Sequence, residues 1–311
     1  MSETATAGAS DSFPMPEAPF GRMLTAMVTP MSSDGAVDYD GAARLADYLV
    51  TQMRNDGLVI SGTTGEAPTT SDSEKENLLR AVIGAVGERA SVLAGVGTND
   101  TAHSVELARQ AERAGADGLL VVTPYYNKPP QAGLVSHFTA VADATGLPVV
   151  LYDIPGRTGT KIAFESLVQL APHPRIVAVK DATGDLGAGS VVMAATDLVY
   201  YCGDDMLNLP WLSVGACGVV SVVGHVAGDR IAGMIAAYGA GRVGSATAIH
   251  RELLPVYTGV MTRTQGVITT KAALSMLGLP GGPVRPPLAD ATEAQKEQLR
   301  TDLVAGGVKL R

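Results

Sequence analysis

The 311-residue sequence has few cysteines, few lysines and few aromatic residues. Its two cysteines, Cys202 and Cys217, form no C-x-x-C pair, so a disulfide framework is excluded and a reducing, cytoplasmic location is favoured. The histidines never recur at H-x-x-x-H spacing, and the sequence therefore predicts no metal site. No G-x-G-x-x-G opens a helix early in the chain, which disfavours a dinucleotide-binding sheet.

Basic charge is also scarce. The chain has 23 Lys and Arg residues against 31 Asp and Glu residues, and its net charge of −8 disfavours nucleic-acid binding. Charged residues interrupt the most apolar stretch, residues 216–238, so no membrane span is predicted. Residues 1–19 lack the basic start and apolar run of a signal peptide, and we expect them to form a disordered tail.

Apolar residues are plentiful, at 46% of the chain, and they recur as short runs that predict a globular α/β fold. The runs are continuous rather than alternating, as in parallel strands covered on both faces, and they start 20 to 35 residues apart. Eight such β-α units predict a closed (β/α)8 TIM barrel over residues 20–241. The predicted strands are Met23–Thr29, Leu58–Ser61, Val92–Gly95, Gly118–Val122, Val149–Tyr152, Ile176–Lys180, Leu198–Cys202 and Gly218–Val222.

Amphipathic segments between these runs predict the covering helices, such as 40–54 and 102–114. Ser73 is followed three residues later by Glu76, a capping-box pattern that predicts a helix over 73–86. Residues 242–311 carry further helical patterns and predict a small C-terminal helical domain. An open, doubly wound sheet is the alternative architecture.

Lys180 is the sharpest candidate for chemistry. It is the one lysine of seven that ends an apolar run, and in a barrel such strand ends form the active site. Burial favours the neutral amine, which can attack a ketone to form a Schiff base and then stabilise an enamine. The alternative is a lysine that pairs with Asp181 or a nearby carboxylate at the barrel rim.

Other candidates follow neighbouring strands. The Gly-Thr-Thr-Gly turn at 62–65 suits a carboxylate or a phosphate, although it could be an ordinary turn that caps the next helix. Tyr126 and Tyr152 could relay protons with Thr64 between them, or pack at the rim. Arg157 could bind a substrate carboxylate, or form a surface or interface ion pair.

Four motifs in order along the chain, GTTGE, TPYYNKP, YDIPGRTG and VAVKDATG, resemble the dihydrodipicolinate synthase family over about residues 20–300. The wider relatives include N-acetylneuraminate lyase and the class I pyruvate aldolases. The resemblance implies condensation of pyruvate with L-aspartate 4-semialdehyde to 4-hydroxy-tetrahydrodipicolinate, in lysine and diaminopimelate biosynthesis. It also implies a cytoplasmic homotetramer, a dimer of dimers, that needs no metal or organic cofactor.

The same resemblance implies a role for each matching residue. Lys180 would form the Schiff base with pyruvate, and Thr63 and Thr64 would hold the pyruvate carboxylate. Tyr152 would move protons to and from the imine. Thr64 would link Tyr152 to Tyr126, which would reach across a dimer interface into the neighbouring site.

Three further positions complete the implied site. Arg157 would bind the carboxylate of the semialdehyde, and Gly203 and Val220 would line the pocket of the lysine. Arg157 and the Thr-Thr pair favour the synthase over a lyase. Asp153 stands where synthases more often have Asn, and we expect little effect because it should point away from its neighbour Tyr152.

This sequence differs from lysine-sensitive members of the family at the positions of their regulatory site. In lysine-sensitive members, histidines follow the GTTGE motif, whereas residues 67–75 of this chain contain none. His103 stands where a glutamate would help to bind the lysine amine. We therefore expect feedback inhibition by lysine to be weak or absent.

Overall fold

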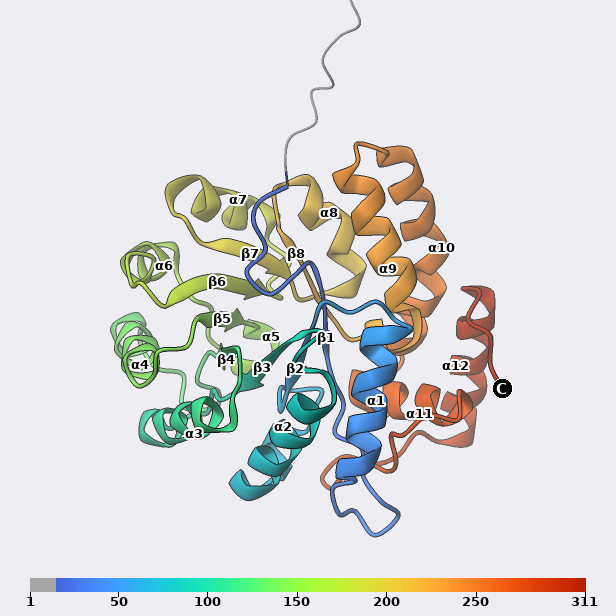
Figure 1. Ribbon diagram of the computed structural model, residues 1–311. Helices are drawn as coiled ribbons and strands as arrows, with labels where there is room; N and C mark the ends of the chain where they lie inside the picture. The colour runs from blue at the N-terminus through green and yellow to red at the C-terminus, as the bar shows by residue number, and fades with distance from the viewer. Residues whose placement is uncertain (1–14) are drawn as a thin grey trace, which may run out of the picture.

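The computed structural model describes residues 15–311, and a closed barrel of eight parallel strands lies at its centre (Figure 1). Each strand pairs with the next along the chain, and β8 closes the barrel by pairing with β1. The predicted (β/α)8 fold is thus confirmed, and the open-sheet alternative is wrong. The strands are β1 (Met23–Ala26), β2 (Gly57–Ile60), β3 (Ser91–Gly95), β4 (Gly118–Val122), β5 (Val149–Asp153), β6 (Ile176–Asp181), β7 (Val199–Cys202) and β8 (Gly218–Ser221).

Helices surround the barrel because alternate residues of each buried strand point outward to an apolar layer. The inward residues, among them Val59, Leu93, Val150 and Val220, form a separate apolar cluster inside the barrel. The covering helices are α1 (Tyr39–Thr51), α2 (Asp72–Val86), α3 (Thr101–Ala114), α4 (Gln131–Asp143), α6 (Phe164–Leu170), α7 (Leu186–Ala195), α8 (Asn208–Ser213) and α9 (Gly224–Gly239).

The predicted first strand is too long by three residues, because β1 ends at Ala26 rather than at Thr29. Beyond Ala26, residues 28 and 29 form hydrogen bonds with groups outside the barrel strands. Val28 N donates to His225 Nε2 over 3.1 Å, and Thr29 Oγ1 donates to the carbonyl oxygen of Gly65 over 2.6 Å.

The capping box of α2 lies two residues before the predicted one. Ser71 Oγ accepts from Glu74 N over 3.2 Å, and Glu74 Oε2 accepts from Ser71 N over 2.8 Å. Ser73 is already helical, and Glu76 pairs with Arg80 one turn further along the helix.

After α9 the chain forms α10 (Val243–Met261), α11 (Gly266–Met276) and α12 (Glu293–Ala305). Of these, α10 and α11 pack against α9, and α12 packs against α10 and α11 (Figure 1). Between residues 15 and 311, no helix is both long and apolar enough to cross a membrane. Most of the predicted tail, residues 1–14, lies outside the described residues, while Met15 packs against the apolar layer.

Candidate active site

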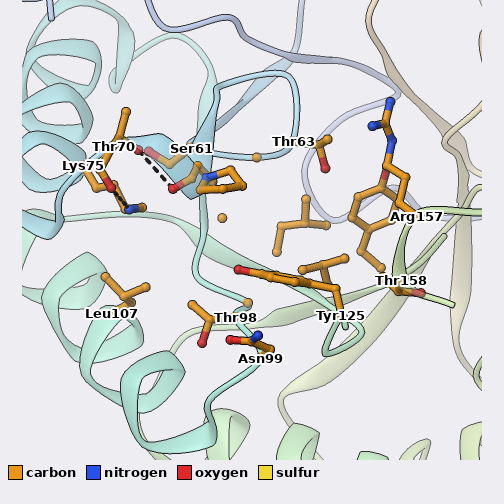
Figure 2. A pocket seen from close by; sticks show the side chains of 18 of the residues that line it. Ser61, Thr63, Thr70, Lys75, Thr98, Asn99, Leu107, Tyr125, Arg157 and Thr158 are labelled. Carbon is orange, nitrogen blue, oxygen red and sulfur yellow. Dashed lines mark hydrogen bonds between the residues drawn. The ribbon is translucent and has the colours of Figure 1, made fainter. Parts of the chain in front are cut away.

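A cavity of about 380 Å³ opens at the carboxyl ends of β2 to β5. Figure 2 shows Thr63 and Arg157 at one end of it and Lys75 and Thr70 at the other, with Tyr125 between them. This is the end of the barrel at which residues from several strands meet, so it is the expected place for catalysis.

Lys180 lies against the ring of Tyr152, which lines the cavity. Only 4% of Lys180 is exposed, and its Nζ lies 3.9 Å from the centroid of the Tyr152 ring. Burial lowers the pKa of Lys180 to about 8, so that much more of the amine is neutral near physiological pH than in an exposed lysine. Asp181 points away and accepts hydrogen bonds from Thr183 N and Oγ1, over 2.9 and 3.0 Å. The ion-pair alternative with Asp181 is therefore wrong.

Asp205 is a charged neighbour of Lys180 that was not among the residues predicted from the sequence. It is 2% exposed, and its negative charge opposes the fall in the pKa of Lys180. Its carboxylate accepts hydrogen bonds from Ser221 Oγ, from Val222 N over 2.9 Å and from Val223 N over 3.0 Å. Its place directly after β7 in a Gly-Asp-Asp run was the available signal.

Tyr152 is 5% exposed, and burial raises the pKa of its phenol to about 12. The positive charge of Arg157 and the neighbouring hydroxyl of Thr63 oppose that rise. A phenol with this pKa is protonated at neutral pH and is a proton donor. The threonine beside Tyr152 is thus Thr63, and not Thr64, which the sequence led us to expect between the tyrosines.

The Gly62–Gly65 turn presents these threonines at the end of β2. Gly65 N donates to the carbonyl oxygen of Gly62 over 3.0 Å, which closes the turn. Thr63 lines the cavity, and Thr64 is buried next to it. Neither threonine caps α2, because Ser71 does so, and the helix-capping alternative is wrong.

Three other predicted residues surround Lys180 and Tyr152. Arg157 lies on the short helix α5 (Pro155–Thr158) with its guanidinium exposed at the cavity wall. A Cβ on Gly203 would lie 3.1 Å from both Cγ and Cε of Lys180, so only glycine leaves room for this side chain. Val220 packs inside the barrel in the same apolar cluster as Tyr152.

Tyr126 is a predicted site residue that does not line the cavity within a single chain. Its side chain is 90% exposed, and its backbone has a φ of 74°. That conformation is uncommon for a side chain of this size.

Charged groups crowd the outer end of the cavity. Lys75 Nζ donates to the carbonyl oxygen of Thr70, and His103 Nε2 lies 2.9 Å from a carboxylate oxygen of Asp72. All four residues lie within residues 67–75 or at His103, the positions on which the expected lack of lysine inhibition depends. In the described part of the chain, no cluster of three or more His, Cys, Asp or Glu side chains is arranged to hold a metal ion.

Comparison with known sequences decides the family. The model of the dihydrodipicolinate synthetase family matches residues 19–305. The chain belongs to the dihydrodipicolinate synthetase family.

Close relatives in this family carry one name. The 4-hydroxy-tetrahydrodipicolinate synthase of Acidothermus cellulolyticus is 68% identical over 93% of this chain and 94% of its own length. The 4-hydroxy-tetrahydrodipicolinate synthase 2 of Streptomyces coelicolor is 64% identical over 95% of this chain and 98% of its own length.

Solved structures of the family share the fold. The enzyme from Cyanidioschyzon merolae, solved with lysine bound, has a TM-score of 0.91 at 41% identity and covers 94% of this chain and 100% of its own. The chloride-inhibited dihydrodipicolinate synthase of Acinetobacter baumannii, complexed with pyruvate, has a TM-score of 0.89 at 34% identity and covers 93% of this chain and 100% of its own.

Proposed function

We propose that this chain is a 4-hydroxy-tetrahydrodipicolinate synthase of lysine biosynthesis, as its relatives are named. The reaction joins pyruvate to L-aspartate 4-semialdehyde through a Schiff base on Lys180. The observation that carries this proposal is the buried Lys180, whose pKa is lowered to about 8 beside Tyr152. A related protein complexed with pyruvate supports the choice of first substrate.

The neutral amine of Lys180 attacks the ketone carbon of pyruvate, and loss of water leaves an iminium ion. Removal of a methyl proton converts this ion to an enamine, whose carbon attacks the aldehyde carbon of the second substrate. The amino group of that substrate then displaces Lys180 from the imine carbon and closes the ring. One water leaves for each product formed, and Lys180 is regenerated as the free amine.

Proton transfer in these steps falls to Tyr152. With a pKa raised to about 12, its phenol donates a proton to the leaving hydroxyl of the first adduct. Thr63, which lies beside that phenol, passes protons onward. Tyr126 of a second copy of the chain completes the relay, which accounts for a tyrosine that is 90% exposed in one subunit.

Substrate binding falls to two groups at the cavity wall. Thr63 and Thr64 offer hydroxyl and backbone N–H donors to the pyruvate carboxylate at the turn after β2. Arg157 binds the carboxylate of the semialdehyde, for which its exposed guanidinium is suited. Gly203 and Val220 shape the space around Lys180.

The proposal extends to assembly and location. An exposed Tyr126 that serves a neighbouring site requires a dimer, and we propose a homotetramer built as a dimer of dimers. Cys202 and Cys217 are both free and buried, which suits a cytoplasmic protein. No residue of the proposed mechanism requires a metal or an organic cofactor.

The test is a condensation assay with a covalent trap. Pyruvate and borohydride should add a reduced pyruvyl group to the peptide that carries Lys180, and Lys180→Ala should abolish the label. The purified chain should also consume L-aspartate 4-semialdehyde faster than N-acetylneuraminate. Labelling of another residue would refute the mechanism, and preference for the sugar acid would make the chain a lyase.

A further inference from the structure

A second lysine is as deeply buried as Lys180. Lys271 lies on α11, outside the barrel, and is 3% exposed. Its Nζ lies 2.6 Å from Oε1 of Glu66, which is also 3% exposed. The same Nζ donates to the carbonyl oxygen of Pro283 over 2.7 Å. Since buried ions lose their hydration, each of these two charges depends on the other.

Glu66 ends the GTTGE motif, two residues after Thr64. Its backbone has a φ of 56°, a left-handed conformation that a residue with a side chain keeps only where its surroundings hold it. Glu66 N donates to the carbonyl oxygen of Thr63 over 3.2 Å. The second carboxylate oxygen, Oε2, accepts from Arg285 N over 2.8 Å. Both oxygens of this carboxylate are therefore held by the segment 271–285.

The same C-terminal segment holds the chain that follows the turn. The guanidinium of Arg285 donates to Glu74 Oε1 over 2.6 Å and to Glu74 Oε2 over 2.9 Å. It also donates to the carbonyl oxygen of Thr69 over 2.7 Å. The stretch from Glu66 to Glu74 is thus anchored at both ends by groups far away in the sequence.

We propose that the ion pair between Glu66 and Lys271 is a positioning device for catalysis. It holds the turn so that Thr63 stays beside Tyr152 and the turn keeps its donors aimed at the pyruvate carboxylate. Neither Glu66 nor Lys271 lines the cavity, so both act through the turn rather than by touching substrate. The inference rests on the proposed function, because it assigns the turn its part in pyruvate binding and proton transfer.

A pair that only stabilises the fold would behave differently from one that positions the turn. Loss of folded protein lowers the apparent kcat and leaves both KM values unchanged. A displaced turn raises the KM for pyruvate and lowers kcat, while the KM for the semialdehyde, which depends on Arg157, stays the same. The split between the two KM values therefore separates the roles.

The experiment uses Lys271→Met, which keeps the length of the side chain, and the double variant Glu66→Gln/Lys271→Met, which leaves no unpaired charge. Lys296→Met is the matched control, because Lys296 forms an exposed pair with Glu293 at 2.8 Å on α12. Steady-state kinetics in both substrates and thermal unfolding are measured for each. We expect the double variant to melt closer to the wild type than Lys271→Met does, and yet to show a pyruvate KM raised ~10-fold with a reduced kcat.

Wild-type kinetics in the double variant, or unchanged KM values with a reduced folded fraction, would overturn the proposal. If Lys271→Met does not fold, the double variant alone decides between these outcomes. A different result would refute the proposed function. If the wild-type protein neither traps pyruvate nor catalyses the condensation, the proposed function is wrong, whatever the variants show. In that case the double variant is compared with the wild type by hydrogen exchange of the amides of residues 62–66, and unchanged protection would overturn the positioning role.

Discussion

Asp153 lies directly opposite Asp181 in the register between β5 and β6, one residue beyond the pairing of Tyr152 with Lys180. Both carboxylates are buried on the outer face of the barrel, away from the cavity. Asp153 Oδ2 accepts from Ile162 N over 3.1 Å, and its Oδ1 has no hydrogen-bond partner within residues 15–311. Burial, with a smaller contribution from Asp181, raises the pKa of Asp153 to about 7.

Asp153→Asn should stabilise the protein increasingly as the pH rises. The pKa of an aspartate in the unfolded chain is about 3.9, whereas that of Asp153 in the folded protein is about 7. The free energy of unfolding therefore falls as the pH rises from about 4 to 7, because the folded protein must deprotonate a buried carboxyl group, and it is lowest above pH 7. The amide carries no charge, and the gain should reach on the order of 2 to 4 kcal/mol at pH 8. Urea unfolding at pH 5 and pH 8 measures it, with Asp197→Asn at an exposed position as control. An equal gain at both pH values would contradict the prediction.

The rate of pyruvate trapping should follow the titration of Lys180. Burial lowers the pKa from its ordinary value to about 8, so the rate should rise steeply from about pH 6, pass its midpoint near pH 8 and level off above about pH 9. The charge of Arg157 contributes to this lowering, and Arg157→Met should move the midpoint to higher pH. Single-turnover trapping across this range checks both statements. A midpoint near the ordinary lysine value, or a shift to lower pH in the variant, would refute them.

Gly203→Ala should slow imine formation without unfolding the chain. The added methyl would lie 3.1 Å from Cε of Lys180 and 2.9 Å from the carbonyl oxygen of Asp181. Moving these groups should cost about 1 to 3 kcal/mol of stability and displace the amine from its position beside Tyr152. Gly84→Ala is the control, since nothing lies within 4 Å of its Cβ and it should stabilise α2 slightly. Equal trapping rates in the two variants would contradict the prediction.

Tyr126 should act in the site of a neighbouring subunit. Its side chain is 90% exposed, so Tyr126→Phe should change stability by less than about 0.5 kcal/mol while it lowers the condensation rate. Dissociated and reassembled together, Tyr126→Phe and Lys180→Ala subunits should regain activity, because one mixed site then has both groups intact.

Tyr152→Phe mixed with Lys180→Ala is the control for this complementation. Tyr152 and Lys180 belong to the same subunit's site, and their mixture should regain nothing. Recovery in both mixtures, or in neither, would place Tyr126 outside the neighbouring site.

L-Lysine should inhibit the condensation weakly or not at all. The ammonium of Lys75 already occupies the outer end of the cavity and donates to the carbonyl oxygen of Thr70. A second ammonium there would meet a like charge in a half-buried setting, which disfavours binding. Initial rates with added L-lysine test this. Inhibition in the millimolar range, with lysine bound at the subunit interface, would contradict it.

The fold and the burial of Lys180 were predictable because their signals are local. Continuous apolar runs define the strands, and Lys180 ends one of them, so its burial follows from the strand itself. The partners of Glu66 were not predictable in this way. Lys271 lies in a mixed Thr-Thr-Lys stretch of α11, and nothing near it in the sequence indicates that α11 packs against the turn after β2.

The sequence also did not predict correctly which side chain of a short segment faces a given partner. Which of Thr63 and Thr64 faces Tyr152 depends on a turn between residues with positive φ, Ser61 and Glu66. A shift of one residue in such a turn exchanges the two side chains, and composition does not distinguish them. The capping box of α2 was displaced by two residues for a similar reason, since three of the four residues Ser71 to Glu74 are chemically suited to the cap.

The pairing of Glu66 with Lys271 also has a consequence for when the protein becomes active during its synthesis. Every residue proposed for the chemistry has been synthesised once Val220 has been added, but Lys271, the counter-ion of Glu66, is added later. A nascent chain that has completed the barrel therefore holds its reacting groups around a turn whose buried carboxylate has no counter-ion. We expect unfinished or prematurely terminated chains to be inactive for this reason, so that catalysis begins only when synthesis has passed Lys271.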